Sequence, residues 1–158
     1  MPGVRDMDFT FAMFERAMHR IYMDVKGDKP DIILGLARGG LIPAVRLSHL
    51  LGVPMEPLYW SLRDAERRDN IENIKEDLLT RVDYKVLVVD DIVDSGKLMS
   101  EVVEYLCDGN YPMLGKIQTA SLVYNKSQQL HKPYFYFQEI DRNVDTEWIN
   151  FWWEERYE

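Results

Sequence analysis

Three aspartates that lie close together in the sequence have the spacing of a binding or catalytic loop. Asp90 and Asp91 follow an apolar run, and Asp94 is followed directly by Ser95 and Gly96. Adjacent carboxylates repel each other and are costly to bury unless they bind hydroxyl groups or a cation. The amides after Asp94 precede a predicted helix, whose N-terminus favours an anion. This loop therefore offers carboxylates for hydroxyls or Mg²⁺ and amides for a phosphate, which together fit a sugar phosphate. The alternative is that the two adjacent acids only cap the helix.

A second loop, at residues 35–40, combines three glycines with one arginine. Gly39 and Gly40 allow the backbone to approach a ligand closely, and Arg38 beside them offers a forked donor for phosphate. The alternative is a tight turn with a solvated arginine. The loop is not a nucleotide P-loop, because apolar residues follow Gly40 where Lys and Ser or Thr would stand.

The elements that must position these loops alternate between strands and helices. Residues 86–89 form a continuous apolar run, which is typical of an interior strand that is buried on both faces. Residues 61–80 carry many charges and little apolar periodicity, so they are expected to form a long exposed loop with at most a partial helix. The remaining strands are expected at 31–36, 55–60, 117–123 and 134–137, and the helices at 9–24, 41–51 and around 99–106. This order predicts an α/β fold with a mostly parallel central sheet and helices on both of its faces.

The overall composition limits the class of protein. The 158 residues are 46% hydrophobic and predict a single globular domain. The net charge of −8 argues against a nucleic-acid partner, because nonspecific binding to nucleic acid needs a basic surface. Cys107 is the single cysteine, which excludes an intrachain disulfide, and we expect it to fill the core. We find neither an apolar run of membrane-spanning length nor a signal peptide, and we expect a cytoplasmic protein with no membrane partner.

Residues 86–97, Val-Leu-Val-Val-Asp-Asp-Ile-Val-Asp-Ser-Gly-Lys, resemble the phosphoribosyl pyrophosphate motif of type I phosphoribosyltransferases. That motif has two acids after a hydrophobic strand and then Asp-Thr/Ser-Gly. Residues 37–40 resemble the pyrophosphate-binding loop of the family, and the charged stretch 61–80 falls where the family carries a mobile flap. Residues 148–154 resemble the purine-binding segment of the xanthine-guanine and hypoxanthine branch. The resemblance covers roughly residues 30–155 in the order of the family.

The resemblance implies a Mg²⁺-dependent glycosyltransferase of purine salvage. Such an enzyme moves the phosphoribosyl group from phosphoribosyl pyrophosphate to a 6-oxopurine (guanine, xanthine or hypoxanthine) and releases pyrophosphate. We expect one phosphoribosyltransferase domain over residues 1–158, with a purine-binding C-terminal segment at about 139–158. Its partners would be these small molecules, and we expect a homo-oligomer, either a dimer or a tetramer.

The resemblance also implies roles for residues around the sugar and its phosphates. Asp90 and Asp91 would bind the ribose hydroxyls, and Asp91 is the better candidate of the two for Mg²⁺. Glu154 stands where purine members carry an acid that reaches a second Mg²⁺ or the base, although it could instead be a solvated surface residue. Asp94 is the candidate general base that takes a proton from the purine ring nitrogen. The groups expected to bind the 5-phosphate are Ser95, Gly96, Lys97 and Leu98, and those expected to receive pyrophosphate are Arg38, Gly39 and Gly40. Among Arg63, Arg67 and Arg68, one could close over pyrophosphate, or all three could be solvated.

The base would bind near the C-terminus of the chain. Trp148 would stack on the purine and the backbone of Ile149 would read its edge, although a tryptophan at this place could instead pack in a core or an interface. Asn125 or Lys126 would face the 6-position.

Two positions depart from the family pattern and leave alternatives open. Leu98 stands where the family usually has Thr, and Asn125 stands where the purine branch usually has Lys. The alternatives are a phosphoribosyltransferase for another base, such as a pyrimidine, a degenerate relic that only binds ligand, or a non-catalytic regulator that binds phosphoribosyl pyrophosphate.

Overall fold

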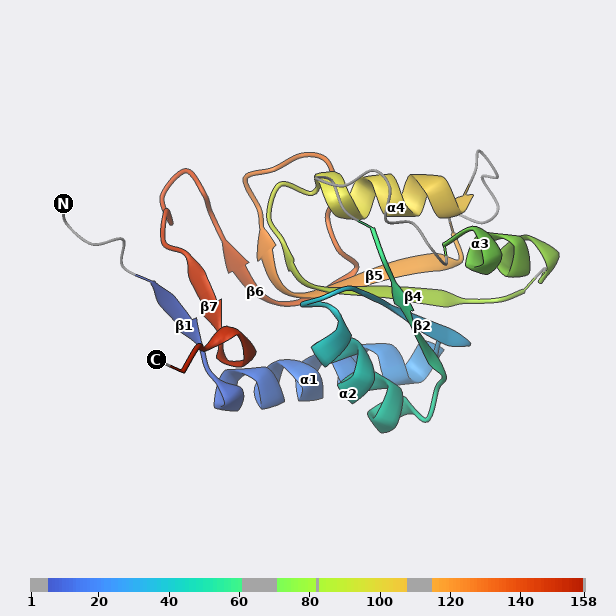
Figure 1. Cartoon of the computed structure of the whole chain (residues 1–158), viewed down its shortest axis with the longest axis horizontal. Helices are drawn as coiled ribbons and strands as arrows, with labels where there is room; N and C mark the ends of the chain where they lie inside the picture. Colours follow the sequence, from blue (N-terminus) through green and yellow to red (C-terminus); the bar gives the residue numbers. More distant parts are fainter. Residues whose placement is uncertain (1–5, 61–70, 82, 108–114, 158) are drawn as a thin grey trace.

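Five parallel strands form the central sheet of the protein. The computed structural model describes residues 6–60, 71–81, 83–107 and 115–157. The strand order is β3-β2-β4-β5-β6 (Figure 1). The strands are β2 (Ile32–Leu36), β3 (Met55–Leu58), β4 (Val86–Val93), β5 (Ile117–Asn125) and β6 (Phe135–Ile140). The α/β class and the parallel sheet predicted from the alternation of elements are confirmed.

Strand β4 lies in the middle of the sheet because its side chains are apolar on both faces. It pairs with β2 on one side and with β5 on the other. Val86 and Val88 pack toward α3 and α4, whereas Leu87 and Val89 pack toward α1 and α2. The alternation of side chains along a strand therefore supplies both halves of the core. The strand continues beyond the predicted 85–89, so that Asp90 and Asp91 belong to it.

Helices cover both faces of this sheet (Figure 1). They are α1 (Phe11–Val25) and α2 (Leu41–Leu51) on one face, and α3 (Ile71–Thr80) and α4 (Lys97–Cys107) on the other. Helix α1 begins where the hydroxyl of Thr10 accepts a hydrogen bond from the Met13 amide. Helix α2 ends at Gly52, which has the left-handed conformation (φ 63°) expected of a C-cap. Cys107 is buried, as predicted.

Helix α3 occupies the second half of the stretch 61–80, for which a long exposed loop with a partial helix was expected, and one face of this helix is buried. Ile71, Ile74 and Leu78 are buried and contribute to the core on the α4 side of the sheet. Their spacing is helical, but charged residues separate them and conceal the short apolar stripe. Residues 61–70 lie outside the described residues, so the first half of the expected flap and the three arginines at 63, 67 and 68 lie outside them as well.

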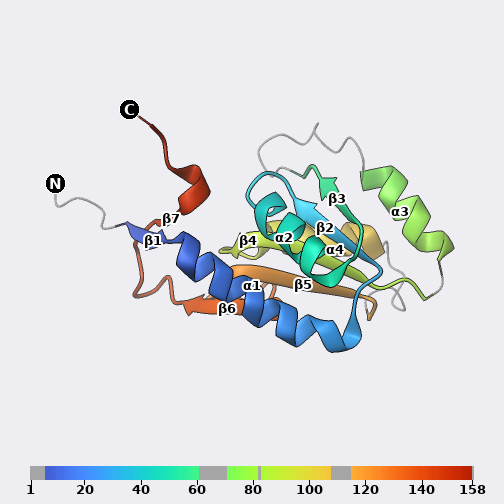
Figure 2. The same ribbon diagram turned by 90° about the horizontal axis from the view of Figure 1, so that it is seen from below.

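The two ends of the described chain meet in a separate two-stranded ribbon. Strand β1 (Met7–Phe9) runs parallel to β7 (Ile149–Phe151), and the 3-10 turn η2 (Trp152–Glu154) follows it. Figure 2 shows this ribbon beside the sheet, with both chain ends on the same side of the molecule. Another 3-10 turn, η1 (Lys26–Asp28), follows α1. In the described part of the chain, no helix has the length and apolar character needed to cross a membrane.

Candidate functional site

The carboxyl end of β4 carries two adjacent acids that are bonded to the backbone. Asp90 is only 8% exposed, and its Oδ1 accepts a hydrogen bond of 2.9 Å from the amide of Asp91. The Oδ1 of Asp91 accepts one of 2.7 Å from the amide of Ile92. These bonds fix the orientation of both carboxylates, and each of them still has free lone pairs.

The surroundings of this pair disfavour negative charge. Burial raises the pKa of Asp90 well above its ordinary value, and the charge of Asp91 raises it further. Burial also raises the pKa of Asp91, and the nearby charge of Glu154 adds to the rise, against hydrogen bonds that lower it. Within the described residues, neither acid forms an ion pair with a basic side chain. A cation or a set of hydroxyl donors would therefore be stabilised here.

The glycines of the loop before α2 lie directly against these acids. A Cβ on Gly39 would overlap the carboxylate of Asp91, and a Cβ on Gly40 would come within 2.5 Å of the Val89 carbonyl oxygen. Arg38 is exposed beside them. The absence of side chains at both glycines is what brings this loop and the end of β4 together.

The connection from β4 to α4 forms a small cavity of about 140 Å³. Gly96 has φ 78° there, and the Lys97 amide donates to the hydroxyl of Ser95 over 3.3 Å. Because α4 begins at Lys97, its first free amides lie at this cavity. The cavity is lined by Asp90, Ile92, Val93, Asp94, Ser95, Gly96, Leu98 and Met99. The residues predicted to cradle a phosphate are thus found at the N-terminus of α4.

A larger open cleft of about 880 Å³ joins the glycine loop to the C-terminal segment. Trp148 lies on its wall with 62% of its surface exposed, whereas Ile149 is buried in β7. The lining residues are Arg38, Gly39, Ile42, Trp148, Asn150, Trp153, Glu154, Glu155 and Arg156. The fold therefore brings residues predicted for pyrophosphate, metal and base to one cleft.

Asn125 and Lys126 were predicted to face the base, but they line neither the small cavity nor the larger cleft. Asn125 is 5% exposed and donates from Nδ2 to the carbonyl of Asp94 over 2.9 Å. Its Oδ1 accepts from the amide and the hydroxyl of Ser127 and from the amide of Arg142. The Nζ of Lys126 lies 3.9 Å from Glu139. A direct contact from Asn125 to a base would have to displace some of these hydrogen bonds.

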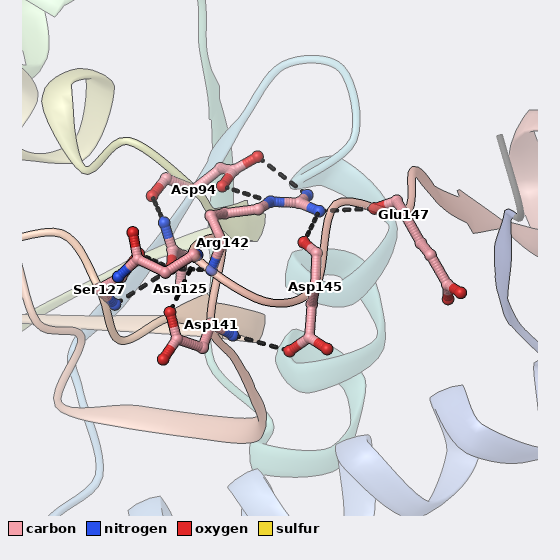
Figure 3. Close-up of polar contacts among 8 residues, drawn as sticks. Asp94, Asn125, Ser127, Asp141, Arg142, Asp145 and Glu147 are labelled. Carbon is pink, nitrogen blue, oxygen red and sulfur yellow. Dashed lines mark hydrogen bonds and ion pairs between the residues drawn. The ribbon is translucent and has the colours of Figure 1, made fainter.

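Arg142 joins this network and was not singled out in the sequence. Its guanidinium binds both oxygens of Asp94, with Nε to Oδ1 and Nη2 to Oδ2 each at 3.0 Å (Figure 3). The two residues are 48 positions apart, and no local spacing links them. The two residues meet because the loops that follow β4 and β6 lie close together in the fold.

Comparisons with known proteins agree with this geometry. A family model described as phosphoribosyl transferase domain matches residues 10–158. The chain belongs to the phosphoribosyltransferase family. A solved purine phosphoribosyltransferase from Pyrococcus horikoshii is 30% identical, with a TM-score of 0.73 over 97% of this chain and 96% of that one. A xanthine-guanine-hypoxanthine phosphoribosyltransferase from Helicobacter pylori is 25% identical, with a TM-score of 0.74 over 96% and 94%.

A curated relative points to another branch of the same family. An orotate phosphoribosyltransferase from Caldanaerobacter subterraneus subsp. tengcongensis is 34% identical over 79 residues. That match spans 50% of this phosphoribosyltransferase and 38% of the relative's length.

The acids of this phosphoribosyltransferase fit a hard divalent cation. Asp91 lies in β4 and Glu154 in η2, and the charge of Glu154 acts on Asp91. Within the described residues, no group of three or more potential metal ligands converges on one point. Two carboxylates without a full protein cage suit Mg²⁺, which commonly completes its coordination with water and substrate phosphates.

Proposed function

We propose that this phosphoribosyltransferase transfers the phosphoribosyl group of phosphoribosyl pyrophosphate to a 6-oxopurine and releases pyrophosphate, as in purine salvage. The observation that carries this proposal is the meeting of the buried acid pair, the amide cradle and the Trp148 cleft at one edge of the sheet. The purine assignment is supported by the likeness, over nearly the whole chain, to proteins named as purine phosphoribosyltransferases.

The sugar phosphate would be held by charge and backbone amides. Asp90 and Asp91 accept hydrogen bonds from the ribose hydroxyls, for which their oxygens retain free lone pairs. The 5-phosphate lies at the N-terminus of α4, where amides and the helix dipole favour an anion. Leu98 has no hydroxyl, so this site depends on Ser95 and the backbone. Arg38 and the Gly39 amide receive pyrophosphate.

The reaction separates pyrophosphate from the anomeric carbon and joins that carbon to a purine nitrogen. The sugar becomes oxocarbenium-like as the bond breaks, and alignment of the incoming base lowers the barrier. Asp94 takes the proton from the attacking nitrogen. When bound by Asp91 and Glu154, Mg²⁺ would offset the negative charge of the leaving group. Glu154 lines the same cleft as Arg38, which supports a role for both residues near the leaving group.

Recognition of the base combines stacking with hydrogen bonds at its edge. Exposed Trp148 offers a face that any purine can use, so it selects the class of base rather than one base. A donor at the 6-position favours a 6-oxopurine over adenine by ~1–3 kcal/mol, because the amino group of adenine would leave that donor unpaired. Lys126 or Asn125 remains the proposed donor, and the Ile149 backbone the proposed reader of the ring edge.

A second candidate is a pyrimidine acceptor, which the partial match to an orotate phosphoribosyltransferase favours. In that case the position of Trp148 in the cleft would be unrelated to the acceptor. A regulator that binds phosphoribosyl pyrophosphate without chemistry is a third possibility.

The deciding experiment measures pyrophosphate release by purified protein with phosphoribosyl pyrophosphate and one base at a time. The bases are guanine, hypoxanthine, xanthine, adenine, uracil and orotate, each with Mg²⁺ and with EDTA. We expect the highest initial rates with a 6-oxopurine and loss of activity in EDTA. Adenine, uracil or orotate as the best acceptor would overturn the base assignment. Tight binding of phosphoribosyl pyrophosphate without release with any base would instead support a regulator.

A further inference from the structure

Arg142 connects two loops that meet above the carboxyl ends of the strands (Figure 3). Its guanidinium donates to both carboxylate oxygens of Asp94 in the β4–α4 loop, each over 3.0 Å. Its Nη1 also donates to the carbonyl oxygens of Asp145 and Glu147, over 3.1 and 2.5 Å, in the β6–β7 loop. The side chain is largely covered, with 23% of its surface exposed. A forked, planar guanidinium is suited to such a fixed arrangement.

The backbone of Arg142 closes a ring through a third segment. Its amide donates to Oδ1 of Asn125 over 3.2 Å, and Nδ2 of Asn125 donates to the carbonyl oxygen of Asp94 over 2.9 Å. Asp94 is therefore held at its side chain by Arg142 and at its backbone by Asn125. The ring ties the end of β5 to both loops.

One of the two carbonyls that Arg142 binds belongs to Glu147, the residue directly before Trp148, and the other belongs to Asp145. Trp148 is 62% exposed, so side-chain packing does little to fix it, and its position follows from its backbone. That backbone is held on one side by the bond from the Met7 amide to the Trp148 carbonyl, at 2.7 Å, and on the other by Arg142. The same guanidinium thus binds the carboxylate of Asp94 and the backbone that leads to Trp148.

We propose that Arg142 is a positioning residue that couples the orientation of Asp94 to the placement of Trp148. This inference rests on the proposed function for the roles of those two residues as proton acceptor and stacking face. Four of the five N–H groups of the guanidinium are occupied by protein oxygens, so Arg142 acts through its partners and not on the substrate. The phosphate cradle at the start of α4 contributes no partner to this ring.

The kinetic test compares Arg142→Met with Arg46→Met. Arg46 makes the same kind of two-nitrogen pair with Glu15, over 3.3 and 3.2 Å, between α2 and α1. We expect Arg142→Met to lower kcat about 10- to 100-fold and to raise KM for the base, because small misplacements of reacting groups are costly. KM for phosphoribosyl pyrophosphate should stay within about threefold of wild type. Arg46→Met should match wild type in all three values.

A conservative variant separates geometry from charge. Arg142→Lys keeps the positive charge but has a single nitrogen that cannot bridge Asp94 and two carbonyls. We expect it to resemble Arg142→Met. Full activity in Arg142→Lys would show that charge alone suffices, and would overturn the proposed coupling.

Amide hydrogen exchange tests the coupling without any activity. Arg142→Met should accelerate exchange at Asp94 and in residues 141–148 together, and Asp94→Asn should accelerate exchange in the distant 141–148 segment. The double variant should add little to either single change, because both remove the same link. Unchanged exchange in 141–148 upon Asp94→Asn, or equal acceleration in Arg46→Met, would overturn the inference.

The kinetic and the hydrogen-exchange measurements together distinguish failure of this inference from failure of the proposed function. If wild-type protein releases no pyrophosphate with any base, the proposed function fails, and the exchange data alone decide whether the link exists. If wild type is active but Arg142→Met affects both substrates equally, the coupling is wrong and the function stands.

Discussion

Burial and the charge of Asp91 oppose the ionisation of Asp90, and burial and the charge of Glu154 oppose that of Asp91, so that the pKa of each carboxyl is raised. A carboxyl group whose pKa is raised by folding binds its proton more tightly in the native state than in the unfolded state. Its contribution to stability is therefore complete below the ordinary pKa and is lost as the pH rises through the raised value. The protein without ligand is therefore less stable at neutral pH than at low pH by this contribution, and a bound cation or sugar would reduce the loss.

Asp90→Asn should stabilise the metal-free protein at neutral pH, because burial raises the pKa of the wild-type carboxyl and asparagine has no charge to bury. The asparagine oxygen can still accept from the Asp91 amide. The gain should shrink as the pH falls through the raised pKa of the wild-type carboxyl and should be lost below its ordinary pKa. Urea unfolding in EDTA at several pH values measures the gap, and a gap independent of pH would contradict the assignment.

Asp94→Asn should lower turnover far more than it weakens binding of phosphoribosyl pyrophosphate. Loss of a general base typically costs on the order of 10²–10⁴ in rate. Steady-state kinetics together with equilibrium binding provide the comparison. Near wild-type turnover in Asp94→Asn would show that Asp94 is not the general base.

Trp148→Ala should weaken binding of the base with little effect on folding. The side chain is 62% exposed, so its removal leaves no large cavity. Stacking of a base on an aromatic ring contributes about 1–3 kcal/mol, which predicts base affinity lower by roughly 5- to 150-fold. Tyr134, which is 70% exposed outside the cleft, gives a matched control as Tyr134→Ala. Calorimetric titration with the base measures both variants, and unchanged affinity in Trp148→Ala would exclude stacking.

The start of α4 depends on a second loop packed against it. A Cβ on Gly96 would collide with the side-chain oxygen of Gln128 and come within 3.0 Å of the His131 amide nitrogen. The Gln128 oxygen is itself held by the amides of Leu130 and His131. The β5–β6 loop therefore supports the phosphate cradle from behind, and only glycine leaves room for it.

Gly96→Ala should reduce both stability and affinity for phosphoribosyl pyrophosphate. The variant combines strain at φ 78° with the collision against Gln128. Gly52→Ala is the matched control, because Gly52 also has a positive φ of 63° but nothing lies within 4 Å of its added Cβ. We expect about 1 kcal/mol of destabilisation from strain in both variants, and a further loss of ligand affinity only in Gly96→Ala. If Gly96→Ala and Gly52→Ala bound phosphoribosyl pyrophosphate with equal affinity, the close contact of Gly96 with Gln128 would not support the phosphate cradle.

The two ends of the described chain pair beside the cleft wall that carries Trp148. Strand β1 pairs with β7, and the Met7 amide bonds the carbonyl of Trp148 over 2.7 Å. Phe9 is 1% exposed and packs against Phe151 and Phe137. The N-terminal segment thus supports, through the backbone, the strand that directly follows the proposed stacking residue.

Phe9→Ala should destabilise the whole molecule by about 3–5 kcal/mol, as expected for removal of a buried aromatic side chain. Phe11→Ala, two residues along and 57% exposed, should cost much less. Denaturant unfolding measures both variants. If the two costs were equal, the ribbon formed by β1 and β7 would not be packed against the core as described.

Local sequence patterns were sufficient to predict much of this molecule. The apolar run 86–89 predicts an interior strand because a strand buried on both faces cannot alternate with polar residues. The span of α2 with its terminal glycine, and the acids that follow the apolar run, are also readable within about ten residues. Each of these features depends on neighbours in the chain, so one sequence contains the whole signal.

Other features arise only from contacts between distant segments. The Arg142–Asp94 pair spans 48 residues, and the pairing of β1 with β7 joins the two ends of the chain. The charge of Glu154 acts on Asp91, and no spacing in the sequence predicts this interaction. The extent of helix α3 could not be predicted from the sequence, because its three apolar positions are identified as one face only by their packing against the core. Tertiary structure decided these points because parallel strands bring their carboxyl ends, and the loops that follow them, to one edge of the sheet regardless of their separation along the chain.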